Sequence, residues 1–356
     1  MMNMNMKQYG MNDRFAALAS MYEEEGLIVG RVISQEKDLY SIMTEHGERF
    51  AEVSGRFRYQ VSAVSDYPAV GDFVMVDPGQ YEGNAVIHHV LPRKSCFLRR
   101  AAGDARQEQV VAANIDTLFL CMSLNNDFNL RRLERYLSVA WDSGAIPVVV
   151  LTKADLCTDP ESRLAEVTSI AMGVDVLVTT AAEQDGYVQI LPYLTEGKTA
   201  AFLGSSGVGK STLINCLLGE KRLDTNGIRN DDKGRHTTTR RQLILLPQGG
   251  MVVDTPGMRE LGMWDTGEGI GQTFADIEEL AEQCRFFDCS HTSEPGCAVR
   301  RAIEEGKISE SRFQSWMKLQ AENEYAKDSE SYLAAKERKF KEIAKYNKGK
   351  RKRGTV

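Results

Sequence analysis

The stretch Gly204-Ser205-Ser206-Gly207-Val208-Gly209-Lys210-Ser211 follows the apolar run Thr199–Leu203 and leads into a helical pattern from Thr212. It matches G-x-x-x-x-G-K-[ST] with the strand and helix that this pattern requires on either side. The glycines let backbone N–H groups turn inward around a phosphate, where the helix N-terminus adds positive potential. Lys210 is placed to reach the β- and γ-phosphates and Ser211 to ligate Mg²⁺. The pattern predicts a phosphate-binding loop whose contacts extend from Gly204 to Thr212.

A second motif follows one strand later, in Met251-Val252-Val253-Asp254-Thr255-Pro256-Gly257. The carboxyl ends of parallel strands meet at one edge of a sheet, so Asp254 is expected beside the magnesium ion, directly or through water. Gly257 lets a backbone N–H approach the γ-phosphate. D-T-P-G alone could be an ordinary turn, and its position after the phosphate loop favours the magnesium site.

The stretch Thr152-Lys153-Ala154-Asp155 ends another apolar run and resembles the N-K-x-D with which GTPases read guanine. A carboxylate at Asp155 accepts hydrogen bonds from the guanine ring N–H and amine, and it rejects adenine, which would leave it unpaired. Thr180-Ala181, after the next strand, is a candidate backbone contact to the guanine oxygen. Thr179-Thr180 is an equally possible alignment, and a chance T-K-x-D is the alternative for the whole motif.

The base motif precedes the phosphate loop, which reverses the order found in ordinary GTPases. A circular permutation keeps every contact, because both motifs lie at strand ends of one sheet. Between residues 115 and 253, apolar runs alternate with helical patterns, including one near 186–194. This alternation predicts an α/β domain with a largely parallel sheet covered on both faces.

The N-terminal part has a different texture. Five short β-branched-rich runs, at 27–33, 39–44, 48–53, 73–77 and 85–90, favour a small β-barrel of the OB type over a sandwich. Before them, residues 1–25 contain one short helical pattern. After them, residues 93–106 are predicted to form a basic linker.

A cluster of three cysteines and a histidine follows the sheet: Cys284, Cys289, His291 and Cys297. Three thiolates and one imidazole match a closed tetrahedral site, so one structural zinc ion per chain is predicted. Disulfides are the weaker explanation in a reducing cytosol. The other four cysteines are interpreted as small hydrophobic residues.

Composition limits the class of protein. The chain has 356 residues, 42% hydrophobic, with a net charge of −6. No apolar run approaches the roughly 18 residues that cross a membrane, and the start lacks the features of a signal peptide, so a soluble, cytoplasmic protein is expected. Residues 336–353 carry ten Lys and Arg against two Glu. This run is either a solvated tail or a contact for a polyanionic partner.

Together, these motifs resemble the RsgA family, the circularly permuted GTPases of ribosome biogenesis. The resemblance also rests on Gly234-Arg235-His236-Thr237-Thr238-Thr239. It implies an N-terminal extension (1–25), an OB-fold barrel (26–95), a circularly permuted GTPase domain (96–272), a helical zinc-binding domain (273–335) and a basic tail (336–356). The implied activity is slow GTP hydrolysis, stimulated by the small ribosomal subunit during its late maturation. A monomer that binds GTP or GDP with Mg²⁺ is expected.

The resemblance also suggests roles for single residues. Thr152 replaces the usual Asn, so the side-chain bridge from the base motif to the phosphate loop is expected to be shorter or missing. Met258 stands where Ras-like enzymes have the glutamine that orients water. His236 is the internal candidate for that task, with a solvent-exposed loop histidine as the alternative. Thr238 is implied as a magnesium ligand in the GTP state.

Ribosomal RNA is the implied partner of the basic tail and of the barrel, where the stretch Arg56-Phe57-Arg58-Tyr59 is the most suggestive. Two other functions stay open. The first is an RNA-binding structural assembly factor with a regulatory, non-hydrolysing nucleotide site, which the intact Lys210, Ser211 and Asp254 disfavour. The second is an ATP-dependent kinase or ATPase, which Asp155 disfavours.

Overall fold

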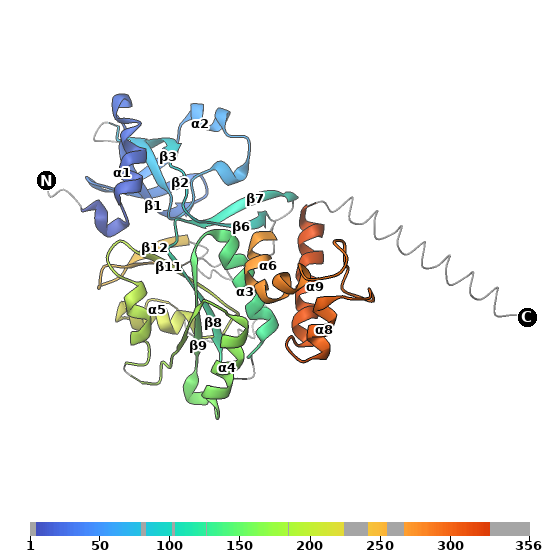
Figure 1. The fold of residues 1–356 in the computed structure, drawn as a ribbon. Helices are drawn as coiled ribbons and strands as arrows, with labels where there is room; N and C mark the ends of the chain where they lie inside the picture. The colour runs from blue at the N-terminus through green and yellow to red at the C-terminus, as the bar shows by residue number, and fades with distance from the viewer. Residues whose placement is uncertain are drawn as a thin grey trace, which may run out of the picture. The chain divides into compact units, whose positions relative to one another are not determined.

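The computed structural model describes residues 5–79, 83–101, 104–125, 127–183, 185–223, 241–254 and 267–327. Internal contacts divide the chain into two units, Met1–Gly262 and Met263–Val356, and each is described by itself. Figure 1 labels the main helices and strands of both. The first unit holds a barrel and a mainly parallel sheet, and the second holds the C-terminal helices.

The barrel of the first unit closes on itself. Its strands are β1 (Ile28–Glu36), β2 (Leu39–Thr44), β3 (Gly47–Val53), β4 (Phe73–Asp77) and β5 (Ala85–Val90). They pair in the order β1-β2-β3-β5-β4, and β4 returns to β1; β3 and β5 run parallel and the other neighbours antiparallel. Inward-facing side chains such as Val32, Ile42 and Val76 fill the interior. The predicted barrel is confirmed.

A short helix, α2 (Gly55–Gln60), lies between β3 and β4 in the chain. Ser54 caps it, because its Oγ accepts a hydrogen bond from the N–H of Phe57 at 3.0 Å. Phe57 packs into the barrel core, whereas Tyr59 is 92% exposed. The interpretation of this stretch as an RNA contact is therefore corrected at Phe57, since a ring in the barrel core cannot stack on a base.

Residues 5–25 fold onto the barrel as η1 (Met6–Tyr9), α1 (Asp13–Ser20) and η2 (Glu23–Glu25). The side chain of Asn12 caps α1 by accepting from the N–H of Phe15 at 3.2 Å. The rings of Phe15 and Phe73 lie 4.2 Å apart and are buried together with Leu91. The short helical pattern of the N-terminal extension is thus a helix that covers the barrel.

The sheet of the first unit has the strand order β10-β9-β8-β11-β13-β12. Its strands are β8 (Thr117–Ser123), β9 (Ile146–Thr152), β10 (Asp175–Val178), β11 (Thr199–Leu203), β12 (Arg241–Leu245) and β13 (Met251–Asp254). Only β12 among these is antiparallel to its neighbour β13. Since β8 and β11 are buried along their whole length, they are continuous apolar runs. The predicted parallel sheet is confirmed.

The helices α3 (Leu130–Ser143), α4 (Pro160–Ile170) and α5 (Lys210–Leu218) connect these strands. Helix α3 begins after Asn129, whose side chain accepts from the N–H of Arg132 at 3.0 Å, and it ends at Gly144, where φ is 78°. The helix expected at 186–194 is instead a 3-10 helix, η5 (Val188–Tyr193), which contains Pro192. Proline has no N–H to donate, so it disfavours a regular α-helix there.

Strand β12 joins the sheet to the barrel. It pairs with β13 on one side and with β1 on the other, so eleven strands form one sheet. The predicted linker at 93–106 is wrong, because this region forms β6 (Cys96–Ala101) and the start of β7 (Asp104–Ala113), an antiparallel hairpin. Its apolar residues, such as Phe97 and Val111, are buried, and the basic residues between them conceal the strand pattern in the sequence.

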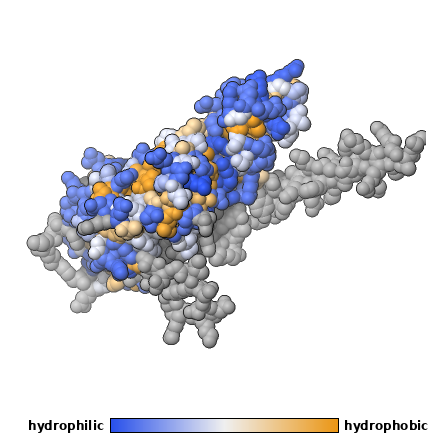
Figure 2. Space-filling view, turned by 90° about the horizontal axis from the view of Figure 1, so that it is seen from below, coloured by the Kyte–Doolittle hydropathy of each residue, from blue (hydrophilic) through white to orange (hydrophobic). Residues whose placement is uncertain are grey.

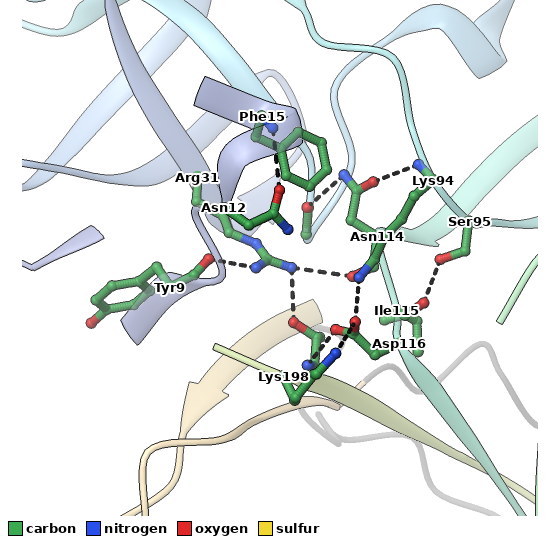
Figure 3. Close-up of polar contacts among 12 residues, drawn as sticks. Tyr9, Asn12, Phe15, Arg31, Lys94, Ser95, Asn114, Ile115, Asp116 and Lys198 are labelled. Atoms are coloured by element: carbon green, nitrogen blue, oxygen red, sulfur yellow. Dashed lines mark hydrogen bonds and ion pairs between the residues drawn. The ribbon is translucent and has the colours of Figure 1, made fainter. Parts of the chain in front are cut away.

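A buried arginine lies where the N-terminal extension, the barrel and the sheet meet. Arg31 of β1 donates to the backbone carbonyls of Tyr9 (2.5 Å) and Asn114 (3.3 Å), and to Oγ1 of Thr199 at 2.9 Å. Burial lowers the pKa of Arg31 to about 10, although the negative charges of Asp116 and Asp72 oppose this shift. Figure 3 shows Arg31 between these segments. Since Thr199 begins β11, the start of the phosphate-loop strand is hydrogen-bonded to the barrel.

The second unit contains α6 (Gly267–Thr273), α7 (Ala275–Ala281), α8 (Ala298–Glu304) and α9 (Glu310–Lys327). Arg312 of α9 forms two hydrogen bonds of 2.8 Å with the carboxylate of Asp276. It also donates to the carbonyl of Thr273 at 2.9 Å and lies over the ring of Phe274. This buried side chain ties α9 to the start of α7.

The face of the molecule in Figure 2 is mostly hydrophilic, with hydrophobic residues in groups between the polar ones. Within the described ranges, none of the helices combines the length and the hydropathy needed to cross a membrane.

Candidate nucleotide and metal sites

The phosphate loop connects β11 to α5. Gly204 adopts a φ of 157°, and a Cβ there would lie 2.5 Å from the carbonyl oxygen of Cys121 on the neighbouring strand β8. Gly209 has a φ of 109° immediately before Lys210, the first residue of α5. Both positions require glycine, because a side chain would clash or strain the backbone. The loop therefore lies close against β8 and leads directly into the N-terminus of a helix.

The ammonium group of Lys210 folds back over this loop. Its Nζ donates to the carbonyl oxygens of Gly204 at 2.5 Å and Ser205 at 2.6 Å. The positive charge thus lies at the concave side of the loop, beside the N–H groups of the helix start. This arrangement suits a phosphate group, which both the ammonium and the helix N-terminus attract.

The base motif lies at the end of β9. Lys153 adopts a positive φ of 57°, which turns the chain into the 3-10 helix η4 (Ala154–Leu156). The hydroxyl of Thr180 donates a hydrogen bond of 2.6 Å to Oδ1 of Asp155, and the Oγ1 atom of Thr180 accepts from the N–H of Ala182 at 3.1 Å. Since β9 and β10 are adjacent and parallel, their ends bring these residues together. Thr180 therefore fixes the carboxylate expected to read the base.

A hydrogen bond joins the base motif to the phosphate loop. The hydroxyl of Thr152 donates to the carbonyl oxygen of Val208 at 2.5 Å. A Cβ on Gly209 would lie 3.7 Å from Thr152, so the two loops are in close contact. Of the two expected outcomes, a shorter bridge or a missing one, the structure shows the shorter bridge. Threonine makes the bridge because the loops approach closely enough for its shorter side chain to reach.

A cavity of about 250 Å³ opens between the two loops. It is lined from both sides, by Thr152, Lys153, Asp155, Leu156, Thr179, Ala181, Ala182, Gly209, Thr212 and Leu213. Pockets for drug-sized ligands occupy roughly 300–1,000 Å³, so this volume suits one ring system rather than a larger ligand. A larger cavity of about 420 Å³ lies on the barrel and contains none of the motif residues. The chemistry of the lining residues, and not the volume, identifies the smaller cavity as the candidate base site.

The sequence patterns did not identify three of these lining residues, Leu156, Ala182 and Leu213, whereas Thr179 belongs to the alternative alignment Thr179-Thr180. Their only signal is position, since each lies next to or within a few residues of a motif. Leu156 and Leu213 add apolar surface to the lining of the cavity. An aromatic ring that covers this surface would remove it from water.

The remaining residues of the predicted nucleotide site are only partly described. Asp254 ends β13, and β13 is hydrogen-bonded to β11 with Val253 opposite Ala201. The carboxylate therefore lies at the same edge of the sheet as the phosphate loop. His236, Thr238 and Gly257 lie outside the described residues.

The cysteine and histidine cluster is assembled in the second unit. The ligand atoms of Cys284, Cys289, His291 and Cys297 all lie within 4.8 Å of one another. The Sγ atoms of Cys284 and Cys297 are 3.8 Å apart, and Nδ1 of His291 lies 3.5 and 3.4 Å from them. Tetrahedral coordination with metal bonds of about 2.3 Å to sulfur and about 2.05 Å to nitrogen gives separations of about 3.8 and 3.5 Å. The four residues can therefore hold a metal ion.

Backbone N–H groups around this cluster donate to two of its sulfur atoms. The N–H groups of Ala298 and Arg300 donate to the sulfur atoms of Cys284 and Cys297 at 3.3 and 3.4 Å. Although desolvation opposes it, hydrogen bonding by backbone N–H groups lowers the pKa of Cys284. The Sγ separation of 3.8 Å also exceeds a disulfide bond of about 2.05 Å. The thiols are therefore unbridged and placed for metal binding.

Comparison with known protein families gives two matches. The family model described as RsgA GTPase matches residues 90–264, which contain the base motif, the phosphate loop and Asp254. A model described as ABC transporter matches residues 189–347. The second range contains the phosphate loop and Asp254 but omits the base motif. A strand, phosphate loop and helix are common to many nucleotide-binding proteins.

Curated relatives resemble the chain over nearly its whole length. A small ribosomal subunit biogenesis GTPase RsgA of Lactiplantibacillus plantarum is 51% identical over 91% of each chain. Another of that name, from Opitutus terrae, is 45% identical, also over 91% of each chain.

Two solved structures are also similar. YjeQ from Thermotoga maritima has a TM-score of 0.62 at 29% identity, over 83% of this chain and 98% of its own. YloQ, a circularly permuted GTPase, has a TM-score of 0.60 at 25% identity, over 84% of this chain and 95% of its own.

Proposed function

Because this chain belongs to the RsgA GTPase family, we propose that it hydrolyses GTP and acts in the maturation of the small ribosomal subunit. The hydrogen bond from Thr152 to Val208 is the observation that carries the proposal for the nucleotide site. It links the base motif and the phosphate loop around one cavity. One guanosine nucleotide spans both loops, with its base beside Asp155 and its phosphates beside Lys210.

The base motif selects guanine. The carboxylate of Asp155, held by Thr180, accepts the ring N–H and the exocyclic amine. The stem of Lys153 covers one face of the ring, and the backbone of Ala181 faces the guanine oxygen. Adenine presents an acceptor where guanine presents a donor, so it would not supply the hydrogen bonds that the carboxylate of Asp155 accepts from guanine.

The phosphate loop, through residues 204–212, binds and orients the triphosphate. The ammonium of Lys210 and the N–H groups at the start of α5 balance its charge. The hydroxyl of Ser211 and the carboxylate of Asp254, directly or through water, would hold the magnesium ion, joined by Thr238 in the GTP state. When bound, Mg²⁺ neutralises charge on the β- and γ-phosphates.

Slow hydrolysis by the chain alone follows from its sequence. Met258 cannot orient water, and His236 is the residue that we assign to this task. Gly257 contributes a backbone N–H to the γ-phosphate. Docking on the small subunit completes the site and raises the rate.

The C-terminal region holds one structural zinc ion, since three thiolates and an imidazole leave no open position. Ribosomal RNA contacts the basic tail at 336–356 and the exposed side of α2, where Tyr59 projects. The domains are an N-terminal extension (1–25), an OB-fold barrel (26–95), a circularly permuted GTPase domain (96–272), a helical zinc-binding domain (273–335) and a basic tail (336–356). The chain acts as a cytoplasmic monomer.

Multiple-turnover GTP hydrolysis, titrated with purified small ribosomal subunits, tests this function. We expect slow turnover alone and a saturable increase with subunits, while ATP is not hydrolysed. Large subunits at equal concentration are the control. If the rate stayed unchanged and binding to the subunit did not depend on the nucleotide, the chain would be a structural RNA-binding factor instead.

A further inference from the structure

The loop after β8 belongs to none of the nucleotide motifs, and it lies between the phosphate loop and the base motif. It follows β8, which is flanked by β9 on one side and β11 on the other. Since all three strands are parallel, their carboxyl ends lie side by side. The loop after β8 therefore emerges between the end of β9, which bears the base motif, and the end of β11, which bears the phosphate loop.

This loop has its own internal hydrogen bonds. The side-chain oxygen of Asn125 accepts from the hydroxyl of Ser123 at 2.8 Å and from the N–H of Asp127 at 3.1 Å. Arg132, in the first turn of α3, donates to the backbone carbonyl of Asp127 and forms an ion pair of 2.9 Å with its Oδ2. Asp127 is thus held at its backbone by Asn125 and Arg132, and at its carboxylate by Arg132.

The same carboxylate contacts the phosphate loop. Oδ2 of Asp127 accepts a hydrogen bond of 2.6 Å from Oγ of Ser205. The carbonyl oxygen of Ser205 in turn accepts from Nζ of Lys210 at 2.6 Å. Ser205 is therefore held at its side chain by Asp127 and at its backbone by the lysine that meets the phosphates.

The groups around Asp127 favour the ionised form of its side chain. Although partial burial opposes it, hydrogen bonds from Ser205 and Arg132 and the nearby charge of Lys153 lower its pKa. A bare carboxylate at this place would repel a triphosphate, and the two cations offset that repulsion. Asp127 thus interacts with both loops of the nucleotide site at once.

We propose that Asp127, held by Arg132, is a positioning residue of the nucleotide site, which fixes Ser205 and through it the ammonium of Lys210. This proposal rests on the proposed function, because it concerns the binding of the same nucleotide. We assign the pair to positioning and not to the chemical step. Its effect is to order the first half of the phosphate loop before the nucleotide arrives.

Loss of Asp127 is expected to weaken nucleotide binding and to leave the rate of GTP hydrolysis by the bound state nearly unchanged. Fixing one residue of backbone corresponds to about a tenfold change in affinity. In Asp127→Ala we expect the Kd for GDP and the KM for GTP to rise about tenfold, with kcat changed less than about twofold. A merely structural defect would instead lower kcat, because fewer molecules would be active.

Three further variants show the route of the effect. Ser205→Ala removes only the hydroxyl donor and should weaken GDP binding as much as Asp127→Ala does. The double variant should lose no more than either single one, since both break the same connection. Asp127→Asn keeps an oxygen acceptor at the same place, so it should recover part of the affinity.

Asp175→Ala is the matched control. This exposed carboxylate also accepts a hydroxyl hydrogen bond, from Tyr193 at 2.7 Å, but it lies at the first residue of β10, away from the loops. Its loss should leave GDP binding unchanged. Thermal unfolding without nucleotide verifies that each variant is folded.

Two results would overturn the proposal alone: wild-type affinity in Asp127→Ala and Ser205→Ala, or additive losses in the double variant. If the unaltered chain bound no guanine nucleotide, the proposed function would fail and this proposal with it.

Discussion

Replacing Thr152 by valine tests the bridge between the two nucleotide loops. Valine has nearly the same shape but no hydroxyl, so the carbonyl oxygen of Val208 loses its donor. Thr152 is 3% exposed and Val208 1% exposed, so water cannot readily replace the bond. A buried polar group left unpaired costs about 1–3 kcal/mol. For a unit of this size, each kcal/mol lowers Tm by about 2–4 °C.

The measurement is urea and thermal unfolding of the nucleotide-free chain, with Thr168→Val as the matched control. The hydroxyl of Thr168 also donates to a backbone carbonyl, that of Leu164 at 2.8 Å, but on the exposed surface of α4. We expect a change of less than about 0.5 kcal/mol there, as for most surface substitutions. If the two variants were equally stable, the bridge would contribute nothing and the reasoning would be refuted.

Two other predictions concern the base loop and the metal cluster. In Gly186→Ala, the new Cβ would lie 2.1 Å from the carbonyl oxygen of Thr180 and would displace the base loop. We expect this displacement to weaken GDP binding at least about tenfold, as measured by titration calorimetry. The control is Gly271→Ala, where a Cβ meets nothing within 4 Å, and this variant should bind GDP normally. For the metal cluster, we expect metal analysis to find about one zinc ion per chain. We expect Cys289→Ser, or a strong chelator, to unfold the second unit, which would be measured as a loss of helical circular dichroism. A second unit that stays folded without metal would contradict the assignment.

The sequence was most informative where local chemistry and periodicity agree. The glycines and Lys210 of the phosphate loop define their own conformation, so the loop could be placed without long-range information. The barrel strands could be predicted because small runs of β-branched residues alternate with turns. In both cases residues close in the chain carry the signal.

Contacts between distant segments could not be predicted in this way. The hydrogen bond between Asp127 and Ser205 depends on the order of strands in the sheet, which a single sequence does not specify. The hairpin β6–β7 was missed because its arginines suggested a linker, although its apolar side chains are buried. The reach of Thr152 to Val208 depends on the distance between two loops, so residue type alone left open whether the shorter bridge would form.

The most direct test of the central claim, that two loops bind one guanosine nucleotide, is equilibrium binding of GDP, ADP and xanthosine diphosphate to the wild type and to Asp155→Asn. Xanthine has an oxygen where guanine has its amine, and an asparagine amide can donate to that oxygen. We predict that Asp155→Asn loses GDP binding by about 100-fold, gains xanthosine diphosphate and still rejects ADP. An unchanged preference for GDP in this variant would contradict the account.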